Sequence, residues 1–504
     1  MNAFYTYQNP IIRGFAPDPS ICKAGDTYYL VCSSFQYFPG LPIFESKDLI
    51  NWKRIGHALT RASQLPLASA ESAGGLYAPT IRYHQGRFYI VCTNCSGCGN
   101  FLVWTDDIYG QWSEPVVIDR DGIDPSLFFE GDKVYFMSNH GDDDGMASIM
   151  QCELDPLTGH TLTEARPIWR GTGGRYLEGP HLYHIGQYYY LLAAEGGTEY
   201  GHMVVLARSK DPYGPFETPA PSHIAANPIV TNRNLGGYQL QGTGHGDLVA
   251  DEKGHFWMVL LAFRQLDRYL PFHHIGREVC LIPVDFTDDG WLICQNNGTV
   301  LLDMKVSDDR PLPKQEFIKK YTFENTSLGL EWVFLRNPFA SNYHMDGNSL
   351  TLHGTTATLD EKHISPTFTG IRQQELAGHI SVDLTSTSQE AGVTLYMDSD
   401  HHYDLALVKI DGHSHIIKRR TISDMQFIQK DIVLPDDVTS IRLDIDMTAL
   451  SYSFAVTCGD NHFDLGSADT RLLSSECACG FTGVMIGLYA VDGQAAFSDF
   501  AYTL

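Results

Sequence analysis

A hairpin pattern that recurs five times in the first 300 residues constrains the fold of this chain more than any other feature. Each copy reads as a short strand, a turn that contains glycine, and a second strand rich in aromatic residues. Consecutive copies begin 60, 46, 55 and 66 residues apart, which leaves room for roughly four short strands in each unit. The five copies begin at Asp18, Ala78, Asp124, Gly179 and His245.

Repeated strand units without helical periodicity predict an all-β fold. Four-stranded units of this kind pack radially around a common axis, so residues 1–306 are predicted to form a five-bladed β-propeller. An irregular array of β-sandwiches is the alternative that the spacing leaves open. A polar stretch with prolines at 307–320 is predicted to be a linker. Residues 321–504 show short alternating strands without such a repeat, which predicts a β-sandwich of the jelly-roll kind.

The charge balance limits the partners of the chain. It has 35 basic and 60 acidic side chains, so its formal net charge is −25 at pH 7. Such a surface repels nucleic-acid phosphates and anionic membranes, and no run approaches the ~20 apolar residues of a membrane span. We therefore expect neither nucleic acid nor a membrane as a partner.

Two features concern the cellular compartment. The N-terminal sequence lacks the basic segment and the apolar segment of a secretory signal peptide. The 11 cysteines, an odd number, favour free thiols over a set of disulfides, and both features predict a cytoplasmic protein. The cysteines at 92, 95 and 98 could begin an iron–sulfur site, but the continuation that such sites need is missing, so buried or loop thiols are favoured.

The predicted propeller gathers acidic residues that lie far apart in the sequence. The innermost strand of each blade lines the central channel, so the starts of equivalent strands form a ring around one end of the axis. Asp18 and Asp124 occupy two of these positions, and Glu178 lies beside a third. Carboxylates held this close shift one another's pKa values. The alternative is that Asp-Pro pairs simply form turns, which explains single pairs better than acids at matching positions in separate blades.

Two carboxyl groups on either side of a small space suit glycoside hydrolysis. One stays protonated and donates to the leaving oxygen, while the other is ionised and activates water or attacks carbon. Aromatic side chains near the ring would supply flat surfaces on which sugars stack. These residues favour a glycosidase, and a non-catalytic carbohydrate-binding protein is the alternative.

Ten segments spread along the whole chain form an ordered set of motifs. Three of them are APDPS at 16–20, SSFQYFPG at 33–40 and EGPH at 178–181. The others lie at 46–52, 77–79, 124–128, 274–278, 328–332, 335–338 and 480–483. Together they resemble the β-xylosidase and α-L-arabinofuranosidase branch of glycoside hydrolase family 43, which carries a C-terminal β-sandwich.

The resemblance implies an inverting mechanism with three carboxyl groups. Asp18 would be the general base that activates water, and Glu178 would be the general acid. Asp124 would raise the pKa of the acid and orient it. Arg277 would donate hydrogen bonds to sugar hydroxyls, because a guanidinium is a planar group with several donors.

The resemblance also assigns the walls of the pocket. Phe35 and Tyr77 would flank the sugar, and Phe481 would reach over from the sandwich to close the outer rim, as expected for an enzyme that removes one terminal sugar. His245 would lie on the axis and contact the substrate, water or a calcium ion beneath the sugar, with a hydrogen-bonded core histidine as the alternative. Calcium prefers oxygen ligands, so no cofactor is expected to be required.

The expected function is the exo-hydrolysis of terminal xylose from xylo-oligosaccharides, with arabinofuranose from arabinosyl-substituted oligosaccharides as a second product of the same pocket. Xylopyranose and arabinofuranose place similar hydroxyls in space, so the sequence does not separate the two activities. The chain is further expected to form a homo-oligomer. His401 and His402 are predicted to lie on a solvated loop of the sandwich.

Overall fold

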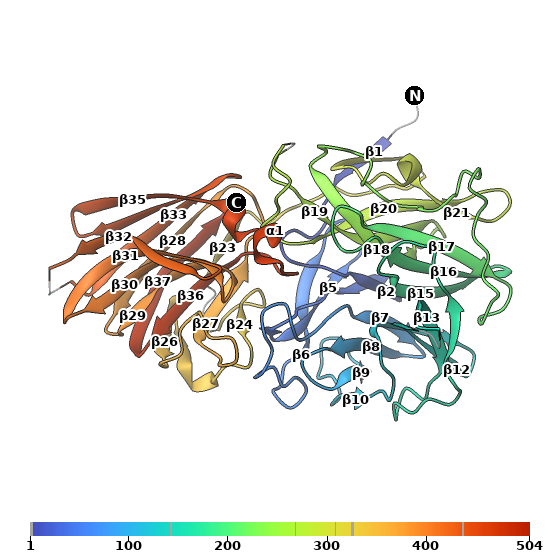
Figure 1. Ribbon diagram of the computed structural model, residues 1–504, viewed down its shortest axis with the longest axis horizontal. Helices are drawn as coiled ribbons and strands as arrows, with labels where there is room; N and C mark the ends of the chain where they lie inside the picture. The colour runs from blue at the N-terminus through green and yellow to red at the C-terminus, as the bar shows by residue number, and fades with distance from the viewer. Residues whose placement is uncertain (1–3, 142–143, 268, 308, 324–326, 436–437) are drawn as a thin grey trace.

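The computed structural model describes residues 4–504 except 142–143, 268, 308, 324–326 and 436–437. Two lobes lie side by side, with the N-terminal part of the chain in one and the C-terminal part in the other (Figure 1). Regular structure in these residues is almost entirely strand, and the α-helix α1 (Ser475–Ala478) has four residues. No helix in this described part is long and apolar enough to cross a membrane.

The N-terminal lobe is a five-bladed β-propeller, as the repeat predicts. Five antiparallel sheets follow one another along the chain, and the innermost strand of each sheet contacts those of the neighbouring blades. The last inner strand also contacts the first, so the ring is closed. The inner strands are β2 (Ser20–Ala24), β7 (Thr80–His84), β11 (Ile123–Glu130), β15 (Glu178–Ile185) and β18 (Leu240–Ala250).

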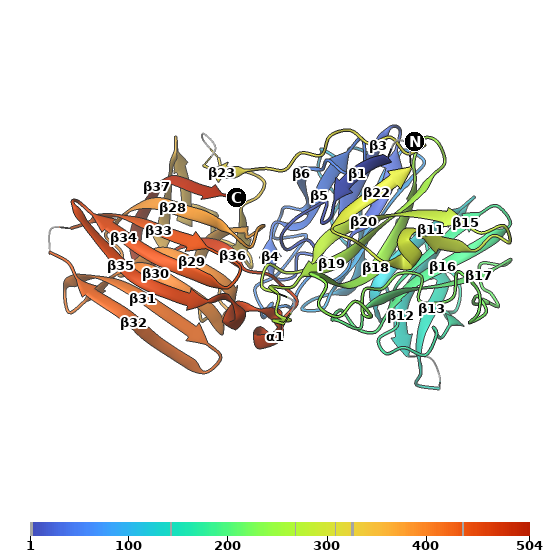
Figure 2. The same ribbon diagram turned by 90° about the horizontal axis from the view of Figure 1, so that it is seen from above.

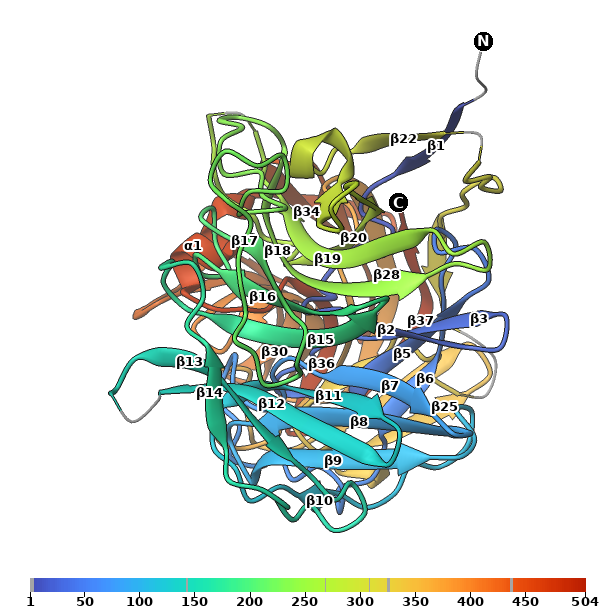
Figure 3. The same ribbon diagram turned by 90° about the vertical axis from the view of Figure 1, so that its right-hand side faces the viewer.

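The blades differ in their outer strands. Four blades have four strands within the described residues, whereas the fourth blade has three, which departs from the expected number. Its outer edge is bridged at Val204 by Val230 from the following connection. Figure 3 views this lobe with the sandwich behind it. The remaining blade strands are β3 (Thr27–Val31), β5 (Gly40–Ser46), β6 (Lys53–Leu59), β8 (Arg87–Asn94), β9 (Gly99–Thr105), β10 (Val116–Val117), β12 (Lys133–Gly141), β13 (Ala147–Glu153), β14 (Arg166–Trp169), β16 (Tyr188–Glu195), β17 (Met203–Ser209), β19 (Phe256–Arg264), β20 (Glu278–Phe286) and β21 (Leu292–Cys294).

Segments from the two ends of the propeller sequence are paired. Strand β1 (Phe4–Gln8) runs antiparallel to β22 (Asp303–Ser307), as Figure 2 shows, and Ile12 bridges Val279 of β20. These pairs join the start of the chain to the last blade. The ring therefore cannot open without the loss of backbone hydrogen bonds.

Four of the five ring positions share an unusual backbone conformation. Asp18, Asp124, Gly179 and His245 have φ values between 52° and 57°, in the left-handed region. The pairing register shifts at the starts of β11, β15 and β18, so Asp124, Gly179 and His245 lie at β-bulges, whereas Asp18 precedes β2. A bulge bends its strand and re-aims the local side chains. At these repeat positions the backbone thus changes direction, at one end of the propeller axis.

The C-terminal lobe is a β-sandwich with a buried apolar core between two sheets. One sheet has the order β25-β26-β37-β28-β33-β34-β35, with β23 also paired to β37; the other has the order β32-β31-β30-β29-β36-β27-β24-β4. The strands are β4 (Tyr37–Phe38), β23 (Lys320–Thr322), β24 (Val333–Leu335), β25 (Tyr343–Asp346), β26 (Ser349–Gly354), β27 (Thr367–Arg372), β28 (Gly378–Ser386), β29 (Glu390–Asp398), β30 (His401–Ile410), β31 (His413–Ile422), β32 (Met425–Val433), β33 (Ser440–Met447), β34 (Ser451–Cys458), β35 (Asn461–Asp469), β36 (Met485–Val491) and β37 (Gly493–Thr503).

The two lobes share a sheet. The last strand of the second sandwich sheet, β4, comes from the first blade, between β3 and β5, and pairs with β24. Next to this pairing, buried Phe15 and Tyr37 from the propeller belong to one apolar cluster with Phe368 and Tyr489 from the sandwich. The lobes are therefore joined by backbone pairing and by a common apolar cluster.

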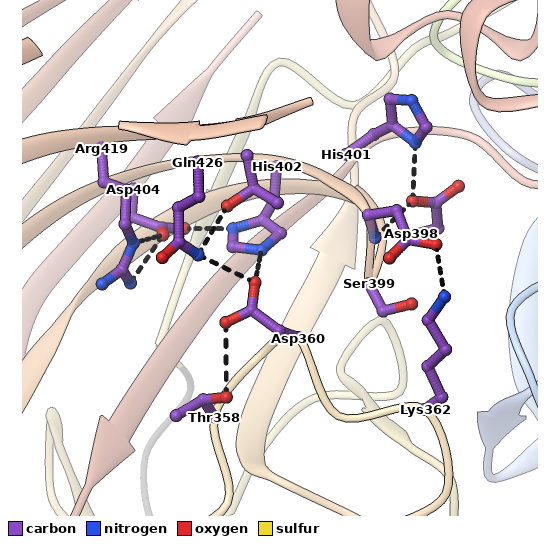
Figure 4. Close-up of polar contacts among 12 residues, drawn as sticks. Thr358, Asp360, Lys362, Asp398, Ser399, His401, His402, Asp404, Arg419 and Gln426 are labelled. Atoms are coloured by element: carbon purple, nitrogen blue, oxygen red, sulfur yellow. Dashed lines mark hydrogen bonds and ion pairs between the residues drawn. The ribbon is translucent and has the colours of Figure 1, made fainter. Parts of the chain in front are cut away.

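His401 and His402 are buried on β30, so the prediction of a solvated loop was wrong. His402 Nδ1 lies 2.9 Å from Asp404 Oδ1, and its Nε2 lies 3.1 Å from Asp360 Oδ1 (Figure 4). His401 Nδ1 lies 2.9 Å from Asp398 Oδ1. These carboxylate partners make the burial of two polar rings tolerable. Asp360 belongs to the connection between β26 and β27, and no local sequence pattern marks this contact.

Candidate active site

A pocket of about 100 Å³ lies where the starts of the inner strands meet the sandwich. It contains all eight residues singled out from the sequence: Asp18, Phe35, Tyr77, Asp124, Glu178, His245, Arg277 and Phe481. The other lining residues are Ala78, Ile123, Thr198 and His202. The structure therefore brings side chains from all five blades and from the sandwich to one place.

Two of the lining residues were indicated neither by the repeat nor by the family motifs. Thr198 and His202 come from the connection between β16 and β17, outside the inner strands. Ile123 precedes Asp124, and Ala78 is the ring position of the second blade, so the repeat marks the neighbourhood of both. Connections of this kind carry no periodic signal, and only the folded chain shows which of their residues reach the pocket.

Asp18 is buried, and both of its carboxylate oxygens accept hydrogen bonds. Arg277 Nη1 donates to Oδ1 at 3.0 Å, and the Ser33 hydroxyl donates to Oδ2. Burial alone would raise the pKa of Asp18, but the Arg277 charge and the Ser33 hydrogen bond help to outweigh it and hold the pKa below its ordinary value. Asp18 is therefore ionised at neutral pH and can accept a proton.

Glu178 has the opposite tendency. Burial raises the pKa of Glu178, the charge of Asp18 adds to this effect, and the pKa is about 7 despite the nearby Arg277. Burial also raises the pKa of Asp124 well above its ordinary value, with further contributions from the charges of Glu178 and Asp18. Because Glu178 and Asp124 interact, they titrate as a pair that keeps a proton near neutral pH.

Arg277 connects a carboxylate, a propeller loop and the sandwich. Besides Asp18, its Nη1 donates to Thr198 Oγ1 at 2.8 Å, and its Nη2 donates to the backbone oxygen of Phe481 at 3.1 Å. The guanidinium carbon lies 5.8 Å from the ring centre of Phe35 and 5.6 Å from that of Phe481. A planar group held by so many contacts has a well-defined orientation at the pocket.

Three aromatic rings form one wall of the pocket. The centre of the Phe35 ring lies 5.6 Å from that of Tyr77 and 6.0 Å from that of Phe481, with which it is stacked. The centres of Tyr77 and Phe481 are 6.5 Å apart. Since Phe481 belongs to the sandwich, the wall is complete only when both lobes are present.

The residues around His245 do not fit a calcium site. The His245 ring centre is 6.3 Å from that of His181, and burial lowers the pKa of both imidazoles, that of His181 to about 3. Asp247 accepts hydrogen bonds from Arg82 and Ser20. Calcium takes about six to eight oxygen ligands. Over the described ranges, no group of three or more His, Cys, Asp or Glu side chains is arranged to hold a metal ion.

The chemistry that this pocket can carry out follows from the different pKa values of Asp18 and Glu178. A carboxyl group that keeps a proton near neutral pH can protonate a leaving oxygen, while an ionised neighbour can take a proton from water. The flat aromatic wall suits the apolar face of a sugar ring. The fold and the site together define a hydrolase that cleaves glycosidic bonds.

Comparison with known proteins gives the same class and a family. The model for glycosyl hydrolases family 43 matches residues 7–292, and the model for the beta xylosidase C-terminal Concanavalin A-like domain matches residues 320–503. The chain belongs to glycoside hydrolase family 43 and is a glycosidase.

Similar proteins match over nearly the whole chain. The chain is 39% identical to the non-reducing end alpha-L-arabinofuranosidase of Bacteroides ovatus, over 97% of this chain and 92% of that protein. It is 37% identical to the xylosidase/arabinosidase of Butyrivibrio fibrisolvens, over 98% of each. The solved structure of the xylan beta-1,4-xylosidase from Bacillus halodurans superposes with a TM-score of 0.89 at 30% identity, over 99% of this chain and 100% of that one.

Proposed function

We propose that this glycosidase is an inverting exo-enzyme that releases a terminal pentose, xylose or arabinofuranose, from oligosaccharides. The observation that carries the proposal is the opposite pKa shift of Asp18 and Glu178 within one small pocket. The names of the relatives support a pentose: alpha-L-arabinofuranosidase, xylosidase/arabinosidase and, at 29% identity, the beta-xylosidase of Bacillus subtilis.

In the proposed reaction, water attacks C1 of the terminal sugar on the face opposite the leaving oxygen. Asp18 takes a proton from this water as the new C–O bond forms. The bond between C1 and the leaving oxygen breaks with its electron pair, and Glu178 gives its proton to that oxygen. The released sugar has the inverted anomeric configuration, and proton exchange with solvent restores both carboxyl groups.

The other residues of the pocket position the reacting groups. Asp124 interacts with Glu178 and helps the pair to keep its proton near neutral pH. Arg277 holds Asp18 and presents a guanidinium to the sugar hydroxyls. The rings of Phe35, Tyr77 and Phe481 flank the terminal sugar. No cofactor takes part in the proposed steps.

The experiment that tests the proposal is product analysis on a panel of aryl glycosides and oligosaccharides. We expect turnover of the β-xyloside, the α-L-arabinofuranoside or both, with one monosaccharide released from the chain end. NMR of the first product should show the inverted anomer. A retained anomer would overturn the mechanism, and binding without turnover would favour the non-catalytic alternative, which the enzyme names of the relatives do not support.

We also propose that the chain forms a homo-oligomer. Strand β32 is an edge strand of its sheet, and it exposes Met425, Phe427, Ile428 and Val433. An edge with unpaired backbone groups and apolar side chains can pair with another chain, and a second copy of the same edge is the partner expected here. Light scattering of the full chain should give at least twice the mass of one chain; a monomer at micromolar concentration contradicts this proposal.

A further inference from the structure

Tyr176 is an exposed aromatic residue two positions before Glu178. Its side chain is 56% exposed, and its backbone has φ 55°, in the left-handed region. Bulky residues rarely adopt this conformation, because it costs of order 1–3 kcal/mol unless the surroundings impose it. Tyr176 is not one of the residues that form the aromatic wall of the pocket. Its position therefore needs a separate explanation.

The segment that precedes Tyr176 is held by hydrogen bonds to a buried carboxyl group. Glu195 is fully buried and accepts hydrogen bonds from Thr172 N at 2.6 Å, from Thr172 Oγ1 at 2.5 Å and from Gly174 N at 3.2 Å. A buried carboxyl group that loses its hydrogen-bond donors is costly, so these three hydrogen bonds tie the donors to Glu195. The loop before Tyr176 is thus held in one conformation.

The segment 196–198 packs against the Tyr176 ring. Gly196 N donates to the Arg175 oxygen at 2.8 Å, which docks the two segments together. A Cβ on Gly197 would lie 3.1 Å from Tyr176 Cδ2, so the absence of a side chain at Gly197 makes room for the ring. The next residue, Thr198, lines the pocket and accepts a hydrogen bond from Arg277. The ring therefore packs against the residue that directly precedes a side chain of the pocket.

Charged groups flank the Tyr176 ring. The guanidinium carbon of Arg175 lies 4.9 Å from the ring centre. Arg175 Nη2 and Glu199 Oε2 are 3.6 Å apart, and both side chains are more than half exposed. A loose, exposed ion pair of this kind contributes little to stability, so its donors and acceptors can turn to other partners. An exposed ring with hydrogen-bonding groups beside it matches a sugar, which has an apolar face and a rim of hydroxyls.

We propose that Tyr176, with Arg175 and Glu199, binds the sugar on the leaving side of the scissile bond. The inference rests on the proposed function, in which Glu178 protonates the leaving oxygen. The leaving sugar must therefore begin at Glu178, and two residues of chain span at most about 7 Å, which places Tyr176 within reach of one sugar ring. The platform selects for leaving groups that are sugars and strengthens binding of the substrate without touching the terminal sugar.

The test compares two substrates that share the terminal sugar and differ in the leaving group. One is the disaccharide of the pentose that the panel identifies, and the other is the corresponding glycosyl fluoride, whose leaving group has no ring. Tyr176→Asn removes the ring but keeps a residue type that tolerates a left-handed backbone. Tyr176→Phe keeps the ring, and Tyr109→Asn changes a similarly exposed tyrosine between β9 and β10.

We expect Tyr176→Asn to lower kcat/KM for the disaccharide by about 5- to 20-fold and for the fluoride by less than about twofold. Tyr176→Phe and Tyr109→Asn should stay within about twofold of the parent enzyme on both substrates. Normal turnover of the fluoride also shows that the variant is folded. An equal loss on both substrates, or no loss on the disaccharide, overturns the platform. If the parent enzyme cleaves neither substrate, the proposed function itself fails, and the two failures are distinguishable.

Discussion

Asp18 and Glu178 lie in one pocket, yet their surroundings move their pKa values in opposite directions. Both carboxyl groups are largely buried, which alone favours the neutral form of each. Asp18 has Arg277 and Ser33 as direct hydrogen-bond donors, so its charged form is stabilised. Glu178 faces the negative charge of Asp18, and its pKa rises to about 7. The acid and the base therefore differ because of their partners and not because of their residue type.

The first prediction concerns Glu178→Ala. The loss of the acid should lower kcat/KM for a disaccharide by about 10²- to 10⁴-fold, because its leaving oxygen needs a proton. A dinitrophenyl glycoside, whose leaving group needs no proton, should lose less than about tenfold. Because Glu178 must be protonated, the parent activity should be present below pH 7 and should fall as the pH rises through about 7. This alkaline limb should be absent from the pH profile of the variant on the dinitrophenyl substrate.

Asp18→Ala is the control variant that separates the role of the general base from that of the general acid, Glu178. It removes the group that activates water, so both substrates should lose activity to a similar extent. Equal losses on the two substrates in Glu178→Ala would show that Glu178 is not the acid.

At the scale of single elements, the bulges at the starts of β11, β15 and β18 turn side chains of a linear repeat toward one pocket. At the start of β15 this position is Gly179, with φ 57°. A Cβ there would lie 2.8 Å from the His245 ring, which occupies the equivalent bulge of β18. Only glycine combines this backbone with this close approach. Asp124 carries its side chain at the bulge of β11, and Asp18 has the same left-handed backbone just before β2.

The second prediction compares Gly179→Ala with Gly186→Ala. Gly186 lies in the turn between β15 and β16, has φ 65°, and has no atom within 4 Å of the added Cβ. Both variants should lose about 1–2 kcal/mol of stability because alanine disfavours the left-handed backbone. Gly179→Ala must also displace His245, so its melting temperature should be lower than that of Gly186→Ala, and its kcat/KM should fall at least about tenfold. Indistinguishable melting temperatures and activities would contradict this account of the bulge.

Strand β30 shows how a polar element becomes part of a core. Burial alone would lower the pKa of His402, but Asp404 and Asp360 outweigh it and raise the pKa to about 9 (Figure 4). A raised folded-state pKa stabilises the fold fully below pH 6.5, the ordinary value of histidine, and this stabilisation is lost as the pH rises through about 9. The connection that carries Asp360 is thus attached to the sheet by a charge that depends on pH.

The third prediction concerns the alkaline stability of the sandwich. Asp360→Asn removes one of the two charges beside His402 and leaves Asp404 in place. We expect the melting temperature at pH 7 to fall by roughly 2–4 °C, because a partly exposed charged hydrogen bond contributes roughly 1 kcal/mol. The further fall between pH 7 and pH 9.5 should be smaller than in the parent protein. If the melting temperatures of the variant and the parent fall by the same amount between pH 7 and pH 9.5, His402 does not titrate in this range.

At the scale of the whole molecule, the sandwich is a structural part of the active site. Strand β4 joins a propeller segment to a sandwich sheet, and Arg336 of the sandwich donates to the Ala70 oxygen of the propeller at 2.9 Å. Near the pocket, Glu476 of α1 accepts from His273 N at 2.9 Å. These contacts place the segment with Phe481 over the propeller, where its backbone oxygen meets Arg277.

The fourth prediction follows from the place of Phe481 in the aromatic wall. Phe481→Ala should lower kcat/KM by about tenfold on the disaccharide and on the glycosyl fluoride alike, because the ring flanks the terminal sugar that both substrates share. This uniform loss contrasts with the selective loss expected for Tyr176→Asn. Phe339→Ala removes a more exposed ring of the sandwich, outside the pocket, and should leave both activities unchanged. A loss of activity on the disaccharide alone would indicate that Phe481 contacts the leaving sugar and not the terminal sugar.

Much of the propeller and of its site was open to prediction because its information is periodic and local. Each copy of the hairpin repeats the same strand and turn pattern, and radial packing of such units leads directly to a ring that holds Asp18, Asp124 and His245, with Glu178 beside it. The family motifs then added Phe35, Tyr77, Arg277 and Phe481. All of these lie together in the structure.

The sequence by itself thus determined the class of fold, the number of blades and the ring of acids, since these depend on patterns within tens of residues. Only the tertiary structure decided which connections reach the pocket, as with Thr198 and His202, and which polar residues become buried, as with His402. It also decided that β4 leaves its blade to complete a sandwich sheet about 300 residues away in the chain. Such contacts depend on which surfaces meet once the propeller ring has closed, and no local pattern of residues encodes that meeting.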